Sequence, residues 1–229
     1  MQHLILLHGA LGSKEQLQPL ADNLSAIFHV HSFNFSGHGG REFADEPFSI
    51  PFFGDQIAEY MHQPGIEQAN IFGYSMGGYA ALYLAKQQPA KINKIVTLAT
   101  KFYWDEKVAA KEVQLLNAAT IKEKVPAFAA QLQQQHAPNN WEELLDKTKE
   151  LLLGLGAKNA LQAEDYAGLS TPCLLLLGDR DKMVTLDETI AVYRQLPSAQ
   201  MGMLPGTAHA FEQVNMNLLS QLITGFIKP

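Results

Sequence analysis

Cysteine is nearly absent from this chain of 229 residues, which contains only Cys173. A single cysteine cannot form a disulfide within the chain, and such cysteine usage is typical of a reducing compartment. Hydrophobic residues make up 47% of the sequence, so the fold has to be stabilised by a buried core. A chain of this length suits one sizeable core with room for an inserted subdomain.

Basic residues are scarce as well. Lysine and arginine number 17 against 23 acidic residues, which gives a net charge of -6, and no basic run occurs. This balance argues against a nucleic-acid-binding protein. The only arginines are Arg41, Arg180 and Arg194. Because arginine is the preferred clamp for carboxylates and phosphates, a dicarboxylate or coenzyme A ester is a disfavoured ligand, although Lys101 or Lys122 could serve instead.

Long hydrophobic runs are also missing. The first apolar run, Leu4-Ile5-Leu6-Leu7, is too short to span a membrane and has no basic region before it. It therefore does not resemble a signal peptide, and the sequence contains no internal repeat or low-complexity tail. We expect a cytoplasmic protein without a membrane span.

Short apolar runs alternate with helix-like segments, which predicts an α/β fold with a mostly parallel sheet. The unbroken apolar run at 173–177 predicts a central strand covered on both faces. The run at 29–35 has polar residues on both faces, which favours an edge strand. Between strands, Ser13 is expected to cap one helix, and Thr185 or Asp187 to open another. The expected strands are His3–Leu7, His29–Phe35, Ala69–Gly73, Ile92–Ala99, Cys173–Leu177 and Gln200–Leu204.

The most specific motif is Gly73-Tyr74-Ser75-Met76-Gly77, between an apolar run and an Ala/Leu-rich segment. A serine flanked by glycines at a strand-to-helix turn is the pattern of a nucleophile elbow. Glycine tolerates the close approach and strained backbone of such a turn. The following helix N-terminus favours developing negative charge near the serine. Ser75 is therefore the candidate nucleophile, and the alternative is a serine that only caps the helix.

A serine hydroxyl needs a base, and the base needs an orienting acid. Two later strands are each followed by a suitable segment, Gly178-Asp179-Arg180-Asp181 and Pro205-Gly206-Thr207-Ala208-His209. Parallel strands bring these segments to the edge of the sheet that carries Ser75. Asp179 competes with Asp181 for the role of the acid, and Asp105 is a weaker competitor.

Five segments together resemble the α/β-hydrolase superfamily over nearly the whole chain: His8-Gly9-Ala10-Leu11-Gly12, Ser36-Gly37-His38-Gly39, and the three described above. The resemblance implies the α/β-hydrolase fold with helices on both faces of the sheet. It implies a catalytic triad of Ser75, His209 and Asp181. It also implies an oxyanion hole formed by the backbone N–H groups of Ala10 and Met76, with Leu11 as the alternative to Ala10. Many similar proteins begin with an antiparallel hairpin, which is missing before His3, so we expect about six strands.

One long stretch, residues 101–168, contains no strand-like run. Helical segments are expected near 105–118, 126–136, 141–153 and 157–165. We expect a helical cap, or lid, inserted into a core formed by residues 1–100 and 169–229. The aromatic run Phe102-Tyr103-Trp104 at its start, with Leu11 and Tyr74, is the expected lining of an apolar substrate pocket.

The remaining histidines are expected to have structural roles. His8 and His38 lie in glycine-rich loops, where they would stabilise the local backbone. His29 and His31 alternate along one strand and face one way, but two histidines without a third ligand do not make a zinc site. No cofactor or metal is therefore expected.

The sequence thus predicts a serine hydrolase that cleaves a small or medium, largely apolar carboxylic ester or thioester through an acyl-enzyme. Carbon–carbon bond hydrolases and proton-abstracting lyases of this superfamily use the same three residues, so they are the alternative. A non-enzymatic binding protein on this fold is disfavoured because all three side chains are present. The expected partner is a small-molecule acyl substrate, and the sequence leaves a homo-oligomer open.

Overall fold

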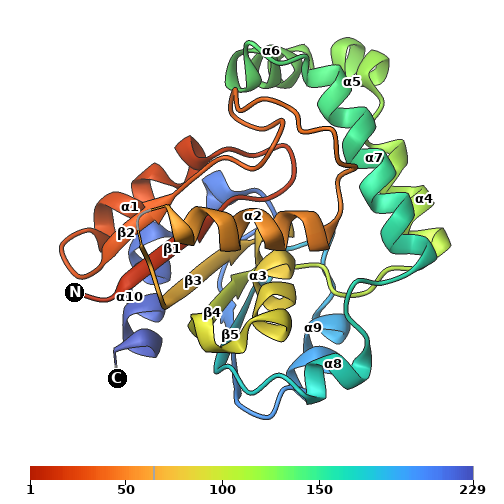
Figure 1. Ribbon diagram of the computed structural model, residues 1–229. Coiled ribbons are helices and arrows are strands. Elements are labelled where there is room, and N and C mark those ends of the chain that lie inside the picture. The colour runs from red at the N-terminus through yellow and green to blue at the C-terminus, as the bar shows by residue number, and fades with distance from the viewer. Residues whose placement is uncertain (64, 229) are drawn as a thin grey trace.

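The computed structural model describes residues 1–63 and 65–228, which form one six-stranded sheet with helices on both faces (Figure 1). The strands are β1 (His3–Leu7), β2 (His29–Ser32), β3 (Ala69–Tyr74), β4 (Ile92–Leu98), β5 (Cys173–Gly178) and β6 (Ala199–Leu204). Their order across the sheet is β2-β1-β3-β4-β5-β6, and every neighbouring pair is parallel. All carboxyl ends therefore meet at one edge, which is where ligands bind in open α/β sheets.

Helices fill the connections between these strands. The α-helices are α1 (Gln18–Leu24), α2 (Ile50–His62), α3 (Met76–Gln87), α4 (Glu106–Gln114), α5 (Ala118–Lys124), α6 (Pro126–His136), α7 (Trp141–Ala157), α8 (Ala163–Ala167), α9 (Leu186–Tyr193) and α10 (Met216–Ile227). Short 3-10 turns are η1 (Lys14–Leu17), η2 (Pro89–Lys91) and η3 (Phe211–Gln213). Within residues 1–63 and 65–228, none of the helices has the length and apolar character required to cross a membrane.

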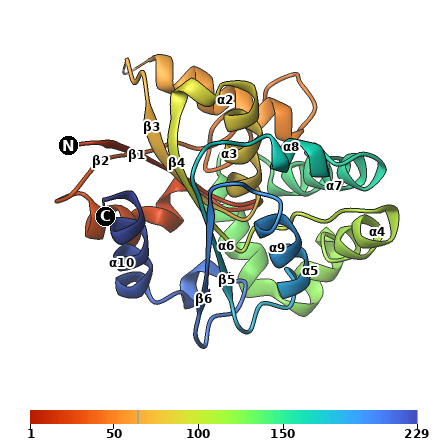
Figure 2. The ribbon, with the colours of Figure 1, turned by 90° about the horizontal axis from the view of Figure 1, so that it is seen from below.

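The sheet separates two hydrophobic cores. Along β1, Leu4 and Leu6 belong to the core under α1 and α10, whereas Ile5 and Leu7 belong to the core under α2 and α3. This division follows from the pleat, which points successive side chains to opposite faces. Figure 2 shows α10 and α3 on opposite sides of the strands. Both faces of the inner strands are covered, which explains their unbroken apolar sequences.

The sequence predicts β2 as an edge strand and β5 as a central strand of the sheet. β2 is an edge strand as expected, although it ends at Ser32 and not at Phe35. β5 is buried at every residue, as its apolar run predicted. It is not central, however, because it lies between β4 and the other edge strand, β6. Its side chains alternate between the two cores, with Cys173 and Leu175 in one and Leu174 and Leu176 in the other, so a strand next to the edge also has both faces covered.

Local capping explains where some of the helices begin. Thr185 opens α9 with a reciprocal capping box, in which its hydroxyl accepts from the Glu188 N–H. Ser13 occupies the N-cap position of η1, as predicted, but its buried hydroxyl makes no capping hydrogen bond. The chain forms the short turn η1 before α1, and Pro19 in the first turn of α1 favours that start.

Residues 101–168 contain α4 to α8 and connect β4 to β5. Figure 1 shows α4, α5, α6 and α7 grouped at one end of the sheet, away from α1 and α10. α5, α6 and α7 share a small core of Ile121, Leu132, Trp141 and Leu145, with Leu11 packed against it. The sequence did not predict α5, because the expected helical segments were 105–118 and 126–136. The chain breaks there because Asn117 caps a new helix through its side chain.

Candidate active site

Ser75 lies at the turn between β3 and α3, in the left-handed backbone region with φ of 50°. Its N–H donates to the carbonyl oxygen of Leu98 on β4 at 2.8 Å, and its carbonyl oxygen accepts from the Thr100 hydroxyl at 3.0 Å. A side chain at Gly77 would place its Cβ 2.7 Å from the carbonyl oxygens of Leu7 and His8. The turn therefore requires glycine where α3 passes β1, and neighbouring strands hold the strained serine.

His209 follows β6 and pairs with Asp181, which follows β5. The His209 Nδ1 lies 2.8 Å from Asp181 Oδ2, while Asp181 Oδ1 accepts from the N–H groups of Met183 and Val184 at 2.8 and 2.9 Å. The Asp181 side chain is completely buried, and burial alone would raise its pKa. The hydrogen bonds from His209 and the backbone outweigh burial, so the pKa of Asp181 is lowered and the carboxylate stays ionised.

The two competing carboxylates have other partners. Asp179 accepts from the backbone N–H of Thr207 at 3.0 Å, which fixes the loop that carries His209. Asp105 caps α4 by accepting from the Val108 N–H at 2.7 Å, and it also accepts from the Tyr103 hydroxyl at 2.9 Å. Only Asp181 contacts His209 among the three.

Ser75 and His209 line the same cavity, which has a volume of about 190 Å³. Within the part of the chain that the structure describes, no hydrogen bond joins their side chains; such bonds are often long until a substrate binds. Tyr74 also lines the cavity, and its hydroxyl donates to the His209 carbonyl oxygen at 2.7 Å, which holds the histidine loop in place. The apolar part of the lining consists of Ala10, Leu11, Ile50, Met76, Trp104, Leu115, Leu116, Leu151, Leu152, Leu155 and Met183.

Backbone N–H groups beside Ser75 are available for an anionic oxygen. Ala10, Leu11 and Met76 line the cavity, and their N–H groups have no backbone acceptor in residues 1–63 and 65–228. Leu11 has a φ of 58°, a strained conformation at the tight turn after β1. An oxyanion hole needs preorganised donors of this kind.

His8 supports the loop that carries Ala10 and Leu11. Its ring is fully buried, with Nδ1 2.8 Å from the Gly9 carbonyl oxygen and Nε2 accepting from the Phe35 N–H at 3.2 Å. Burial lowers the pKa of His8 to about 4, against the opposing hydrogen bond to Gly9. A neutral ring that donates at one nitrogen and accepts at the other fits a structural role. His38 is buried too, and its Nδ1 lies 2.9 Å from the Ser36 carbonyl oxygen.

His136, at the end of α6, is a site residue that the sequence did not predict. Its buried ring places Nε2 3.1 Å from the Leu11 carbonyl oxygen, and its Nδ1 accepts from the Gly39 N–H at 3.0 Å. Gln135 donates to the same Leu11 oxygen at 2.9 Å. α6 therefore also holds the loop that carries Leu11 beside Ser75. No local pattern marks His136, because the contact with Leu11 spans 125 residues.

Two predicted pocket residues lie elsewhere. Phe102 and Tyr103 do not line the cavity of Ser75; they line a neighbouring groove of about 640 Å³, which contains neither Ser75 nor His209. Phe102 packs edge-on against Tyr166, and Tyr103 is 55% exposed with its hydroxyl bonded to Asp105. Of this aromatic run, only Trp104 lines the cavity that contains Ser75.

Three histidines meet at the β2 edge of the sheet. His3 Nδ1 lies 2.9 Å from His31 Nε2, and the rings of His3 and His29 are 5.5 Å apart. The sequence pattern had paired only His29 and His31. Across residues 1–63 and 65–228, however, no group of three or more His, Cys, Asp or Glu side chains has the arrangement of a metal site.

Comparisons with known proteins agree with this fold. The model of the alpha/beta hydrolase fold family matches residues 2–211. A pimeloyl-[acyl-carrier protein] methyl ester esterase of Neisseria meningitidis is 27% identical over 232 residues, covering 92% of this chain and 87% of that protein. The protein of the same name from Aeromonas hydrophila is 26% identical, covering 90% and 88%.

Solved structures show the same fold. A thermophilic esterase from Thermogutta terrifontis superimposes with a TM-score of 0.81 at 18% identity, covering 100% of this chain and 90% of that one. A hydrolase from Pseudomonas aeruginosa gives 0.80 at 15%, with the same coverage. Because the family model spans most of the chain, this protein belongs to the alpha/beta hydrolase fold family and is an enzyme of that family.

Proposed function

We propose that this enzyme is a serine hydrolase that cleaves a small or medium, largely apolar carboxylic ester through an acyl-enzyme on Ser75. One observation carries the proposal: Ser75 shares an apolar cavity with His209, whose other ring nitrogen is bonded to the buried Asp181. Nucleophile, base and orienting acid are thus brought to one site from the ends of β3, β6 and β5.

The proposed reaction has two halves. Ser75 Oγ attacks the ester carbonyl carbon while His209 Nε2 takes the hydroxyl proton, and collapse of the tetrahedral intermediate expels the alcohol, which receives that proton. Water, deprotonated by His209, then attacks the acyl-serine carbonyl carbon; the bond to Ser75 Oγ breaks, the acid is released, and Ser75 Oγ receives the proton from His209. Asp181 holds the imidazole in the tautomer with Nδ1–H and stabilises the imidazolium that forms in each half.

The oxyanion is assigned to the backbone N–H groups of Met76 and Ala10, with Leu11 as the alternative to Ala10. Each donor would lower the barrier by roughly 3 kcal/mol. Because this role belongs to the backbone, Met76→Ala should reduce turnover far less than Ser75→Ala. Comparing kcat/KM of the two variants tests the assignment, and equal losses would contradict it.

Residues 101–168 are proposed to act as a cap over this site, inserted in a core formed by residues 1–100 and 169–229. Trp104, Leu116 and Leu151 from this stretch line the same cavity as Ser75 and Met76. An acyl group in a cavity of about 190 Å³ would be surrounded mainly by aliphatic side chains. This lining supports a substrate whose acyl part is small or medium and largely apolar.

The curated relatives favour an oxygen ester over a thioester as the bond that is cleaved. Their name describes the hydrolysis of a methyl ester on an acyl group linked to a carrier protein. Identity of 26–27% supports the type of reaction and leaves the acyl group to be measured. We therefore propose alkyl esters first, with thioesters of the same acids as the comparison.

A panel of p-nitrophenyl, methyl and thioesters with acyl chains of rising length tests the proposal. We expect hydrolysis of the oxygen esters with an optimum at short or medium chains, and its loss in Ser75→Ala. A preference for thioesters would move the assignment to a thioesterase. No hydrolysis of any ester, in a folded protein whose Ser75 reacts with a fluorophosphonate, would instead favour carbon–carbon hydrolysis or a lyase reaction.

A further inference from the structure

Glu112 is a buried carboxylate in a pocket that is otherwise mainly apolar. It lies on α4, is 7% exposed, and lines the cavity that contains Ser75 and His209. It also lines the groove next to this cavity and the hollow beside Arg180, so it stands where the three spaces meet. The two carboxylate oxygens of Glu112 remain accessible and are not enclosed by packed side chains, so the carboxylate faces these spaces.

Within the described residues, the Glu112 carboxylate has no hydrogen-bond donor and no ion-pair partner at salt-bridge distance. The nearby cation that lines the same cavity, Lys101, has other partners. Its Nζ donates to the Met183 carbonyl oxygen at 2.8 Å and lies 3.6 Å from a carboxylate oxygen of Glu188. Lys101 therefore does not neutralise Glu112, and none of the cations that line the two adjoining spaces, Lys111, Lys182 and Arg180, lies at salt-bridge distance from it within the described residues.

Glu188 is a carboxylate of the same region whose two oxygens both accept hydrogen bonds from backbone N–H groups. One of its oxygens accepts from the Phe102 N–H at 3.0 Å, and the other accepts from the Thr185 N–H at 3.1 Å. Glu112 has no comparable partners, although it is similarly buried. A buried carboxylate that no protein group satisfies has to be satisfied by water or by a ligand, because leaving it unpaired is costly.

This cost discriminates between substrates. An alkyl chain that fills the cavity would displace water from Glu112 and leave the carboxylate unpaired, whereas a substrate with a hydrogen-bond donor at that position would replace the water. An acyl chain that ends in a carboxylate would bring two like charges together. We propose that the substrate presents a hydrogen-bond donor, an amide N–H, hydroxyl or ammonium group, to Glu112, and that this residue determines specificity. The inference rests on the proposed function of the same site.

Matched pairs of esters test it. Each pair consists of the p-nitrophenyl ester of an ω-acetamido acid, which has an amide N–H, and its N-methyl counterpart, which has none. Spacers of different length scan the position of the donor, and ω-amino and ω-carboxy esters of the same length compare an ammonium with an anion. At the best spacer we expect the N–H ester to exceed its N-methyl counterpart at least about tenfold in kcat/KM. The ω-carboxy ester should be the poorest substrate.

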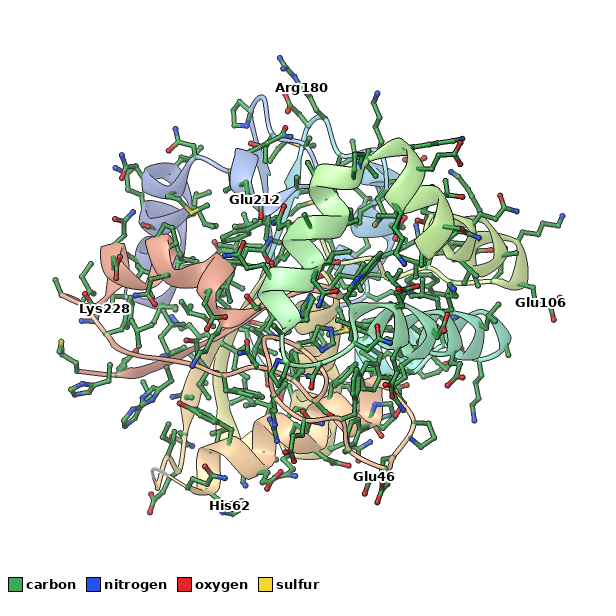
Figure 3. All side chains as sticks on the ribbon, turned by 90° about the horizontal axis from the view of Figure 1, so that it is seen from above. Glu46, His62, Glu106, Arg180, Glu212 and Lys228 are labelled. Carbon is green, nitrogen blue, oxygen red and sulfur yellow. The ribbon has the colours of Figure 1, made fainter. Side chains whose placement is uncertain are left out.

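Variants assign the preference to Glu112. Glu112→Leu should bring the ratio of the N–H ester to the N-methyl ester close to one. Glu112→Gln, which keeps the size and one acceptor, should retain part of that ratio and lose any preference for the ammonium ester. Glu106→Gln, on the same helix but pointing outward at the rim of the molecule (Figure 3), is the matched control and should leave every ratio unchanged.

Two results would overturn the inference: equal kcat/KM within every pair, or a preference that persists in Glu112→Leu. Hydrolysis of unsubstituted esters in the same assay separates this failure from a failure of the proposed function. If those esters are cleaved and the N–H preference is absent, only the role of Glu112 is wrong. If no ester is cleaved, the proposed function fails and the role of Glu112 fails with it.

Discussion

Acid should destabilise this protein well above the pH at which its carboxylates become protonated, because His8 is buried in its neutral form. The folded state holds the pKa of His8 at about 4, while the unfolded chain has the ordinary value of 6.5. Between these values the unfolded state binds a proton that the folded state excludes. Stability is therefore greatest above pH 6.5, falls as the pH decreases from 6.5 to 4, and loses no more from this group below pH 4.

The magnitude follows from the two pKa values. One pKa unit corresponds to about 1.4 kcal/mol, so the shift to about 4 amounts to about 3 kcal/mol in total. Of this, about 2 kcal/mol would be lost between pH 7 and pH 5. His38 and His136 act in the same direction, because burial lowers the pKa of each, so the whole protein should lose more than His8 alone accounts for.

Urea unfolding at pH 7, 6 and 5 measures this effect in the wild type and in His8→Asn. The variant is expected to be less stable at pH 7, since the Phe35 N–H loses its acceptor, but its loss between pH 7 and pH 5 should be smaller by about 2 kcal/mol. Leu20→Ala removes a buried side chain without a titrating group and should keep the wild-type pH dependence. The same loss in His8→Asn as in the wild type would refute the reasoning.

Three further predictions concern the elbow, the acid and one helix cap. Asp181→Asn should lower kcat by roughly 10⁴-fold, and Asp179→Asn by much less; a larger loss in Asp179→Asn would reassign the acid. Gly77→Ala forces a Cβ against two backbone oxygens at 2.7 Å and should lower the melting temperature sharply, so an unchanged melt would contradict the packing argument. Thr185→Ala removes the hydroxyl that caps α9 and should cost about 1 kcal/mol in urea unfolding, while no change would show that the cap is dispensable.

Features encoded by neighbouring residues could be read from the sequence. The apolar runs located all six strands within a few residues, and the pattern around Ser75 predicted the turn and the start of α3 at Met76. The pairing of His209 with Asp181 was accessible because each residue follows a strand, and parallel strands end at the same edge. These inferences depend on the periodicity of apolar residues, which is a local property, and on the parallel order of the strands, which applies to the whole sheet.

Features that depend on the direction of a single side chain could not be read in this way. Phe102, Tyr103 and Trp104 form one aromatic run, yet only Trp104 faces the cavity with Ser75. The contact of His136 with the Leu11 carbonyl oxygen and the burial of Glu112 depend on how α4 and α6 pack against distant parts of the chain. Nothing in their local sequence distinguishes these residues from ordinary helix positions, because tertiary packing decides their surroundings.

Labelling of the folded wild-type protein with a fluorophosphonate, followed by peptide mass spectrometry, tests the central claim most directly. We expect one adduct per chain, on the peptide that contains Ser75, with no adduct in Ser75→Ala and much slower labelling in His209→Ala. A folded protein that is not labelled, or that is labelled at another residue, would contradict the assignment of Ser75 as the nucleophile.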